Sequence, residues 1–296
     1  MNKIQLLITL AITAIAPIVW GSTYIVTSEL LPANSPLLAS TLRALPAGLV
    51  LVMITRILPI GIWWWRLVVL AFLNIGFFFY CLFFAATHLP GGMAALVMSI
   101  QPILVIALSY LLLSNKLNVQ QVLASFVAIG SIALLLINNQ AELSSRGLIM
   151  GLLGTISMAT GIVMTKRWGR PRNMTLLNFT GWQLLLGGGM LLPVAWWFEG
   201  FPEQFSTDNI IGYLYLCVVG AMLAYSLWFN GIDKLPTITL SFLGFLSSVS
   251  AVVLGYIFLG QSLTSLQCLG AAGIFIAIIL ATPKTVALSK QSSPRH

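Results

Sequence analysis

The side chains best suited to chemistry in this sequence are a few polar groups set inside long apolar stretches. Arg43 is the one unambiguous charge within such a stretch, and Asn74 and Gln101 place amides within two others. A charged or amide side chain away from water must face the protein interior, a water-filled cavity or a ligand. Gln101 also precedes Pro102, which removes a helical hydrogen bond at the same depth. These groups are suited to binding a solute.

Aromatic and hydroxyl side chains accompany these polar groups. Binding pockets combine rings with a few amides and hydroxyls, because the rings hold a mostly apolar ligand and the polar groups orient it. We therefore predict one central cavity for an uncharged, zwitterionic or weakly anionic solute of aromatic size. The residues predicted to bind this solute are Trp20, Tyr24, Arg43, Asn74, Tyr80, Gln101, Tyr225, Trp228 and Ser248.

Purely structural roles stay open for some of these residues. Trp20 and Tyr24 approach the end of their stretch, where aromatic residues commonly anchor a helix at the membrane interface. Arg43 lies only two helical turns after Pro36, so its side chain could extend to the membrane boundary. It could also tie helices together without touching a solute.

The sequence lacks the combinations that catalysis or nucleotide hydrolysis would need. It contains no HExxH or GxSxG motif, no Gly-Lys-Ser/Thr phosphate loop, and no Asp or Glu inside an apolar stretch. The Cys residues form no CxxC pair, and one of the two His is terminal. We therefore expect no enzyme activity, no metal ion and no cofactor.

The chain is too apolar for a water-soluble domain, with 59% hydrophobic and 7% charged residues. A membrane-spanning helix needs about 20 mostly apolar residues. We therefore predict an all-α integral membrane protein with ten transmembrane helices. The predicted spans are 6–27, 36–55, 66–87, 92–113, 119–138, 147–165, 176–198, 209–231, 236–258 and 264–281.

The net charge of +8 indicates topology rather than a nucleic-acid partner. With ten spans and a cytoplasmic N-terminus, the Lys and Arg residues gather in the cytoplasm, Arg146 being the one clear exception, whereas five of the six acids fall outside. This partition follows the positive-inside rule. We expect both termini in the cytoplasm and the lipid bilayer as the partner of the outer surface. The basic loop at 166–172 is interpreted as a cytoplasmic anchor, with binding of anionic lipid as the alternative.

One block of the sequence recurs 146 residues later, with Pro90 matching Pro236 and Gln121 matching Gln267. Such a register across two helices and a loop indicates an internal duplication. With five spans per copy, the second copy enters the bilayer upside down, which is the inverted-repeat plan of secondary transporters. We predict a first repeat at 1–138, a linker at 139–146, a second repeat at 147–283 and a short tail at 284–296.

These features resemble a known family. The run WGSTYIV, the Arg in the second span, the Pro in the fourth and the repeated block resemble the EamA branch of the drug/metabolite transporter superfamily over residues 6–281. The runs TLRALPAG, LPGGMAALV, TKRWGRP, GWQLLLGG and GYLYL resemble its PecM-type pigment exporters. The resemblance implies a ten-helix carrier in the bacterial inner membrane that exports small metabolites from a central cavity. The chain departs from the family at Ser114-Asn115 and Gly260-Gln261, where Gly-Glu is common, and at Ser248, which replaces a Pro.

The predicted function is thus secondary transport of a small metabolite, amino-acid-like, aromatic or pigment-like or drug-like, by alternating access. Two other functions stay open: a membrane-bound regulator that acts on a cytoplasmic partner without solute flux, and a channel. The sequence also leaves open whether the protein works as a homodimer.

Overall fold

The computed structural model describes residues 3–32, 35–89, 97–98, 100–116, 118–136, 144–200, 202, 204–259 and 264–282, and every regular element within these ranges is helical. The first part of the chain forms α1 (Lys3–Gly21), α2 (Thr23–Leu30), α3 (Pro36–Thr55), α4 (Trp63–Ala71), η1 (Phe72–Gly76), α5 (Phe77–His88), α7 (Gln101–Leu113) and α8 (Val119–Leu136). The second part forms α9 (Ser145–Trp168), α10 (Leu176–Phe198), α11 (Thr207–Cys217), η2 (Val218–Leu223), α12 (Ala224–Lys234), α13 (Thr237–Leu243), α14 (Leu246–Leu259) and α15 (Ser265–Ala281).

Several of these helices suit a bilayer. Large apolar side chains cover the outside of the bundle, among them Trp197, which is 83% exposed. In the described ranges, six helical stretches are long and apolar enough to cross a membrane, and three shorter apolar helices accompany them. The prediction of an all-helical membrane protein is therefore confirmed. The six stretches are Ile4–Thr27, Pro36–Thr55, Trp63–Ala85, Ser145–Trp168, Thr207–Lys234 and Thr237–Phe258.

Among the described residues, the first, third, eighth and ninth predicted spans are interrupted rather than regular. The first breaks between α1 and α2 at Ser22, and the ninth breaks between α13 and α14 at Gly244. The third and eighth each contain a π-helical segment, η1 and η2. A π-helical turn is wider than an α-helical turn and leaves backbone groups without their usual partners. Most of the predicted linker, 139–143, lies outside the described residues, and α9 begins at Ser145.

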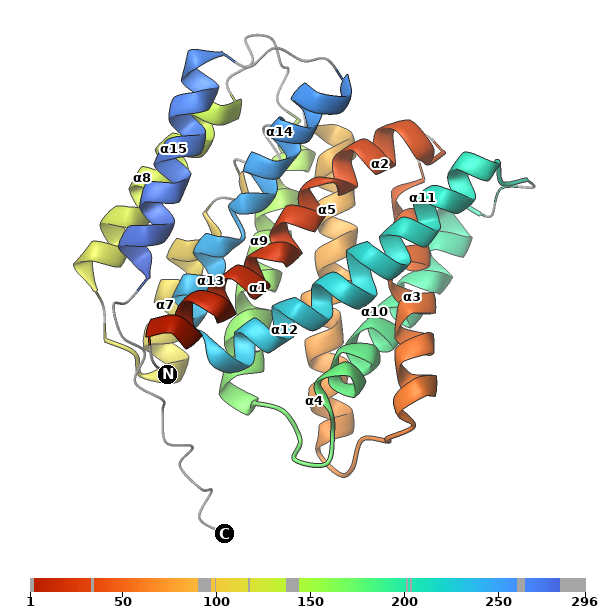
Figure 1. Ribbon diagram of the computed structural model, residues 1–296. Coiled ribbons are helices and arrows are strands. Elements are labelled where there is room, and N and C mark those ends of the chain that lie inside the picture. Colours follow the sequence, from red (N-terminus) through yellow and green to blue (C-terminus); the bar gives the residue numbers. More distant parts are fainter. Residues whose placement is uncertain are drawn as a thin grey trace.

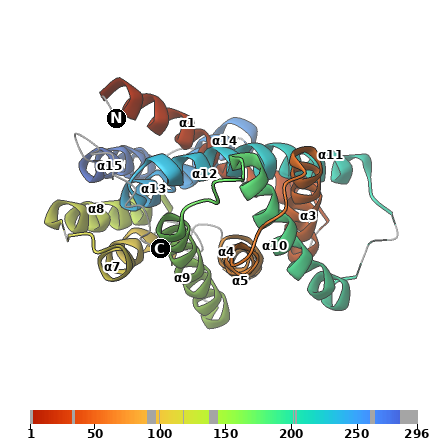
Figure 2. The same ribbon diagram turned by 90° about the horizontal axis from the view of Figure 1, so that it is seen from below.

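Glycines allow the closest helix contact in the bundle, which joins α3 to α10. A Cβ atom added to Gly188 of α10 would lie 2.5 Å from the backbone nitrogen of Leu45, and Gly48 of α3 faces the backbone of Leu185 in the same way. Backbones approach this closely only where no side chain intervenes. Seen from below, α3 and α10 lie side by side at one edge of the bundle and α8 and α15 at the other (Figure 2).

A carboxylate strengthens the α3–α10 contact at one end. The two oxygens of Glu199, which follows α10, each accept a hydrogen bond of 2.8 Å from the backbone N–H groups of Leu37 and Leu38. These N–H groups belong to the first turn of α3 and have no partner within their own helix. Glu199 therefore caps a helix that begins about 160 residues earlier in the chain.

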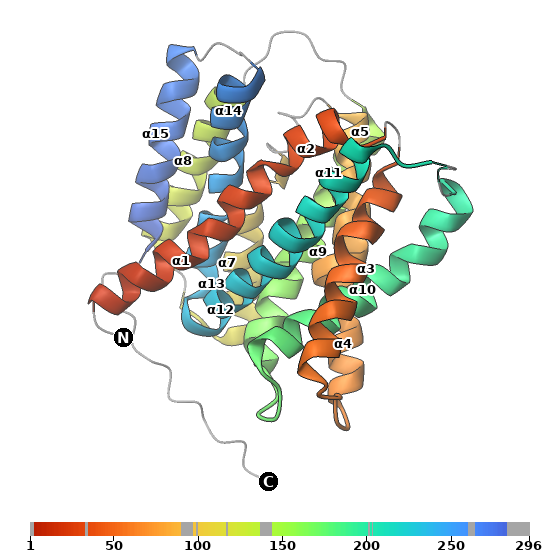
Figure 3. The same ribbon diagram turned by 45° about the vertical axis from the view of Figure 1, so that its right-hand side comes forward.

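The helices run in alternating directions through the bundle (Figures 1 and 3). At the lower end in Figure 1, α1 begins, α3 gives way to α4, α9 gives way to α10, and α12 ends, whereas α5, α2 and α10 end at the upper end. Basic residues occupy the lower helix ends: Arg56, Arg66, Lys166, Arg167 and Lys234. Acidic residues occupy the upper helix ends: Glu29, Glu199 and Asp208.

Candidate functional site

The π-helical segment η2 exposes one backbone carbonyl to the interior of the bundle. The N–H of Ala224 points to the carbonyl oxygens of Val219 and Ala221, so the carbonyl of Gly220 is left for other donors. Two side chains donate to this oxygen at 3.0 Å each, Nε1 of Trp20 from α1 and Nη2 of Arg43 from α3. Gly220 is thus the point at which three separate helices meet through polar contacts.

Arg43 is deeply buried, with 3% of its surface exposed. Its guanidinium carbon lies 5.0 Å from the ring centroid of Phe79 on α5, within the range of a cation–π interaction. The side chain therefore points into the bundle and does not extend to the membrane boundary. Its position is compatible both with a tie between helices and with a contact for a solute.

Aromatic rings surround this polar contact, and we call Trp20, Phe79, Tyr225, Trp228 and Phe229 the aromatic cluster. The ring centroid of Trp20 lies 4.9 Å from that of Tyr225 and 5.2 Å from that of Trp228. Tyr225 in turn lies 5.9 Å from Phe79 and 6.0 Å from Phe229. These separations are typical of packed aromatic pairs. The rings come from α1, α5 and α12, so the cluster exists only when these helices are assembled.

The cluster carries one donor more than it can satisfy. Trp228 is 2% exposed, and its indole N–H has no hydrogen-bond partner among the described residues. Leaving a buried donor without an acceptor costs about 1–3 kcal/mol. Two N–H donors, from Trp20 and Arg43, thus share the carbonyl oxygen of Gly220, and a third, from Trp228, belongs to a ring that packs against Trp20 and has no acceptor among the described residues. The site is therefore suited to a ligand that brings acceptor oxygens.

A second polar contact lies around the other π-helical segment, and we call Asn74, Thr165 and Gln183 the amide node. Nδ2 of Asn74 donates to Oε1 of Gln183 at 2.8 Å and to Oγ1 of Thr165 at 3.2 Å. The hydroxyl of Ser157 donates to the carbonyl of Leu73 in η1 at 2.8 Å. All three members of the node are buried. These bonds tie η1 to α9 and α10.

The structure brings together four of the nine predicted site residues: Trp20, Arg43, Tyr225 and Trp228. Asn74 takes part in the amide node instead. Tyr80 packs against Phe84, with ring centroids 6.1 Å apart. Gln101 begins α7 and Ser248 is buried on α14. The side chain of Tyr24 lies outside the described part of the chain.

Two important groups were not found from the sequence. Phe79 is one of several Phe residues in its span, and nothing in its type distinguishes it from the others. Gly220 contributes a backbone carbonyl, and its role depends on a π-helical turn that has no signature in the sequence. Gln183 did give a signal, because it overlays Arg43 at an offset of 140 residues. Within the described ranges, no group of three or more His, Cys, Asp or Glu side chains could hold a metal ion.

Comparison with known proteins gives a family for this chain. The sequence model of the EamA-like transporter family matches twice, at residues 7–137 and 145–282. Protein PecM of Dickeya dadantii is 49% identical over 265 residues, which cover 90% of this chain and 89% of that protein.

More distant relatives and a solved structure agree with this match. The chloroplastic WAT1-related protein At3g02690 of Arabidopsis thaliana is 30% identical over 88% of this chain and 66% of that protein. A probable amino-acid metabolite efflux pump of Salmonella typhimurium is 26% identical over 88% of this chain and 91% of that protein. One crystal structure superposes with a TM-score of 0.78 at 17% identity, covering 93% of this chain and 96% of that one, and so shares the fold.

Proposed function

Because the chain belongs to the EamA-like transporter family, we propose that it is a secondary transporter that exports a small metabolite across the bacterial inner membrane. The observation that carries the proposal is the surplus of buried N–H donors in the aromatic cluster. The unsatisfied indole N–H of Trp228, in the same aromatic cluster that packs against Arg43, is a donor that a solute oxygen would satisfy. The four residues that form the binding centre are Trp20, Arg43, Tyr225 and Trp228.

The chemistry of this centre favours a flat solute with acceptor oxygens. Aromatic faces hold a ring by stacking or edge contact, and the guanidinium of Arg43 holds a carboxylate or carbonyl oxygen through charge-assisted hydrogen bonds. The carbonyl of Gly220 stands in the position that a solute oxygen would take when it binds to Arg43 and Trp20. An uncharged, zwitterionic or weakly anionic aromatic metabolite fits these donors, whereas a cationic drug does not. Tyr24, Tyr80, Gln101 and Ser248 are proposed as an outer lining.

We also propose that the chain is built as two inverted repeats of five spans, with ten spans in all. The π-helical segments support this plan, because η2 begins at Val218, 146 residues after η1 begins at Phe72, the same offset as the repeated sequence block. The helix contacts support it too: α1 packs on α12 and α14, and α9 packs on α5 and α7. The domain boundaries 1–138 and 147–283 remain those predicted from the sequence.

The proposed topology puts the lower end of Figure 1, with its basic helix ends, in the cytoplasm, and both termini with it. The acidic helix ends would then face the periplasm. The solute would reach the aromatic cluster from the cytoplasm and leave at the opposite end. Alternating access between the two ends is the general mechanism for a site between two repeats.

Binding to the purified protein is the first test. A ligand that binds only the folded state raises its thermal midpoint, so a screen of aromatic carboxylates, their neutral amides and their cationic amine analogues reports the chemistry of the site. We expect stabilisation by the carboxylates and the neutral carbonyl compounds. Arg43→Gln should remove the response to the carboxylates, and Trp197→Phe, at the lipid-exposed end of α10, is the matched control that should not. Stabilisation by the cationic amines alone would contradict the proposed site.

Efflux from preloaded proteoliposomes then separates a transporter from the regulator that stays open as the alternative. A transporter releases the bound solute faster than protein-free vesicles do. A regulator would bind without flux, and a channel would release solute without saturation as the concentration rises.

A further inference from the structure

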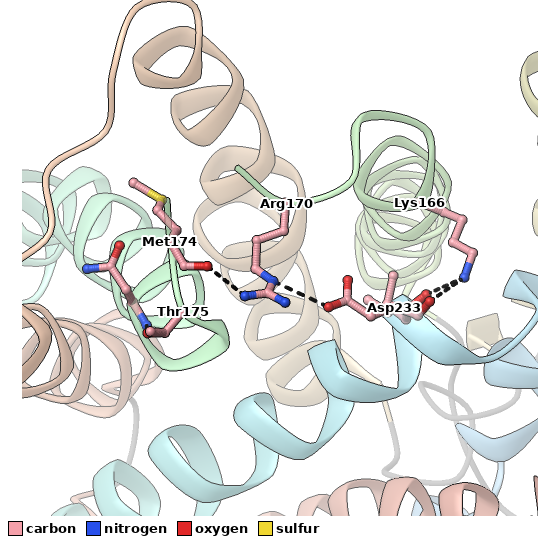
Figure 4. Close-up of polar contacts among 7 residues, drawn as sticks. Lys166, Arg170, Met174, Thr175 and Asp233 are labelled. Carbon is pink, nitrogen blue, oxygen red and sulfur yellow. Dashed lines mark hydrogen bonds and ion pairs between the residues drawn. The ribbon is translucent and has the colours of Figure 1, made fainter. Parts of the chain in front are cut away.

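Basic residues at the end of α9 and in the loop that follows it bind the end of α12. Nζ of Lys166 donates to three backbone carbonyls, those of Ile232 at 2.7 Å, Asp233 at 3.0 Å and Leu235 at 3.0 Å. Figure 4 shows Lys166 reaching toward Asp233. The last carbonyls of a helix have no partner within it and carry partial negative charge. One ammonium group therefore caps the whole end of α12. The sequence had suggested a cytoplasmic anchor for this loop, or binding of anionic lipid, but no contact with another helix.

A second basic residue, Arg170, connects the end of α12 to the start of α10. Nε of Arg170 lies 3.4 Å from Oδ2 of Asp233, and its Nη1 donates to the carbonyl of Met174 at 2.6 Å, next to Thr175, the N-cap residue of α10 (Figure 4). We call Lys166, Arg170 and Asp233 the charged joint. It links the end of α9, the start of α10 and the end of α12 at one end of the bundle.

The joint differs from the other helix contacts in kind. α12 packs along α1, and α9 packs along α5 and α7, whereas α9 and α12 touch only sparsely. The α3–α10 contact rests on backbones in direct apposition and could not open without breaking the core. The two partners of the ion pair are each about one-third exposed, 33% for Arg170 and 30% for Asp233. Water can replace such hydrogen bonds at little net cost, so this contact can open and close.

The joint also lies directly beyond the binding centre. Trp228 and Asp233 are on the same helix, five residues apart, which is about 7.5 Å along its axis. If the end of α12 moves away from α9, the buried side chain of Ile232 is uncovered first, and Phe229 and Trp228 of the aromatic cluster follow. The same end carries the basic helix termini that the proposed topology places in the cytoplasm.

We propose that Lys166 is a positioning residue for transport, which, together with Arg170 and Asp233, closes the cytoplasmic entrance to the aromatic cluster. Lys166 does not touch the solute; it holds α12 against α9, and its release from the three carbonyls opens the entrance. This inference rests on the proposed transport function, since an entrance has meaning only for a solute path.

Side-specific labelling tests the proposal in the full-length protein. A reporter cysteine is introduced by Ser226→Cys on α12, in a Cys268→Ser background, and reacted with a membrane-impermeant maleimide in inside-out and right-side-out vesicles. We expect Lys166→Gln to increase labelling of residue 226 from the N-terminal side roughly tenfold, the population change expected for the loss of a charge-assisted hydrogen bond. Labelling from the opposite side should not rise.

Three comparisons make the result specific. Arg167→Gln removes the same charge one residue away, from an exposed side chain outside the joint, and should leave labelling unchanged. Lys166→Arg keeps a cation at the helix end and should restore most of the protection. Native Cys81, which packs against Gly154 of α9, should stay unlabelled, because general loosening of the fold would expose it as well.

The outcomes separate the joint from the transport function. Labelling that rises equally from both sides, rises at Cys81 as well, or does not rise at all would overturn the proposed role of Lys166. One-sided opening in a protein that fails the binding and efflux assays would leave the joint standing and overturn the transport proposal.

Discussion

Each of the two π-helical segments frees a backbone carbonyl, and we call each such place an opening. The side chains that surround the two openings differ in chemistry. Around η1, neutral amides and hydroxyls bond mainly to one another, and Ser157 serves the carbonyl of Leu73. Around η2, the guanidinium of Arg43 and the indole of Trp20 donate hydrogen bonds to the carbonyl of Gly220, and the indole N–H of Trp228 has no partner among the described residues. Both openings keep an unsatisfied donor, the amide N–H of Gln183 near η1 and the indole N–H of Trp228 near η2. The comparison teaches that they differ in charge and in ring content: neutral amides surround η1, whereas a guanidinium and aromatic rings surround η2.

The difference can be traced to one pair of positions. Arg43 on α3 and Gln183 on α10 correspond at an offset of 140 residues, and each reaches the π-helical segment of the other half. Substitutions that make the halves more alike, or exchange their roles, therefore test the comparison.

The largest effect is expected from Gln183→Arg, which puts a guanidinium into the amide node. The carbonyl of Leu73 already accepts from Ser157, and the one open acceptor recorded in the node, Oδ1 of Asn74, is neutral and cannot offset the charge. A charge in a membrane helix costs about 2.5–3.5 kcal/mol on insertion scales. We predict that little folded protein accumulates, as measured by fluorescence-detected gel filtration. Gln183→Met, which adds no charge, should be far milder, and a fully stable Gln183→Arg protein would show that the node can accept a cation.

Arg43→Gln makes the second opening resemble the first and should abolish function without harming the fold. A charge inside a membrane helix costs about 2.5–3.5 kcal/mol on insertion scales, and Gln avoids this cost, so the thermal midpoint should hold or rise. Transport should fall roughly tenfold or more, the loss expected for a charge-assisted hydrogen bond to the solute. The measurement is efflux per folded molecule, with Arg43→Lys as an intermediate case that keeps the charge but loses the planar fork. Unchanged efflux in the Arg43→Gln protein would show that Arg43 does not bind the solute.

Asn74→Leu should lower stability and spare transport. It leaves the amide oxygen of Gln183 without its donor, which costs about 1–3 kcal/mol. Adding Gln183→Leu removes both partners and should recover part of that loss, as seen in the thermal midpoints. A fall in efflux per folded molecule in the single variant would return Asn74 to the solute cavity predicted from the sequence.

The smallest effect is expected from Ser157→Ala, which removes one neutral hydrogen bond worth about 1 kcal/mol. Trp20→Phe also removes a donor to a π-helical carbonyl, but from the binding centre. We therefore predict unchanged efflux for Ser157→Ala and reduced efflux for Trp20→Phe. Equal efflux from the two variants would mean that the two openings do not differ in function.

The sequence predicted the membrane class, and it predicted that Arg43 and the amides face inward. Both predictions follow from residue types alone, because hydropathy and the free-energy cost of a charge in the bilayer depend on those types. It also predicted Trp20, Tyr225 and Trp228 as members of one centre. It did not predict Gly220, because a carbonyl becomes available only when a turn widens, and widening depends on neighbouring helices. The contacts of Lys166 were not predicted for a similar reason: its charge was visible, but the carbonyls of Ile232 and Leu235 that it binds belong to a distant helix end.

The cap that Glu199 provides for α3 also bears on how the protein is made. The N–H groups of Leu37 and Leu38 emerge from the ribosome long before Glu199 does, so α3 enters the membrane with its first turn unsatisfied and becomes complete only when α10 arrives. The first half of the chain is then a folding intermediate in which the start of α3 stays uncapped until α10 and Glu199 have been synthesised. Separately expressed halves should consequently assemble when produced together, and the first half produced alone should be a ready substrate for membrane quality-control proteases.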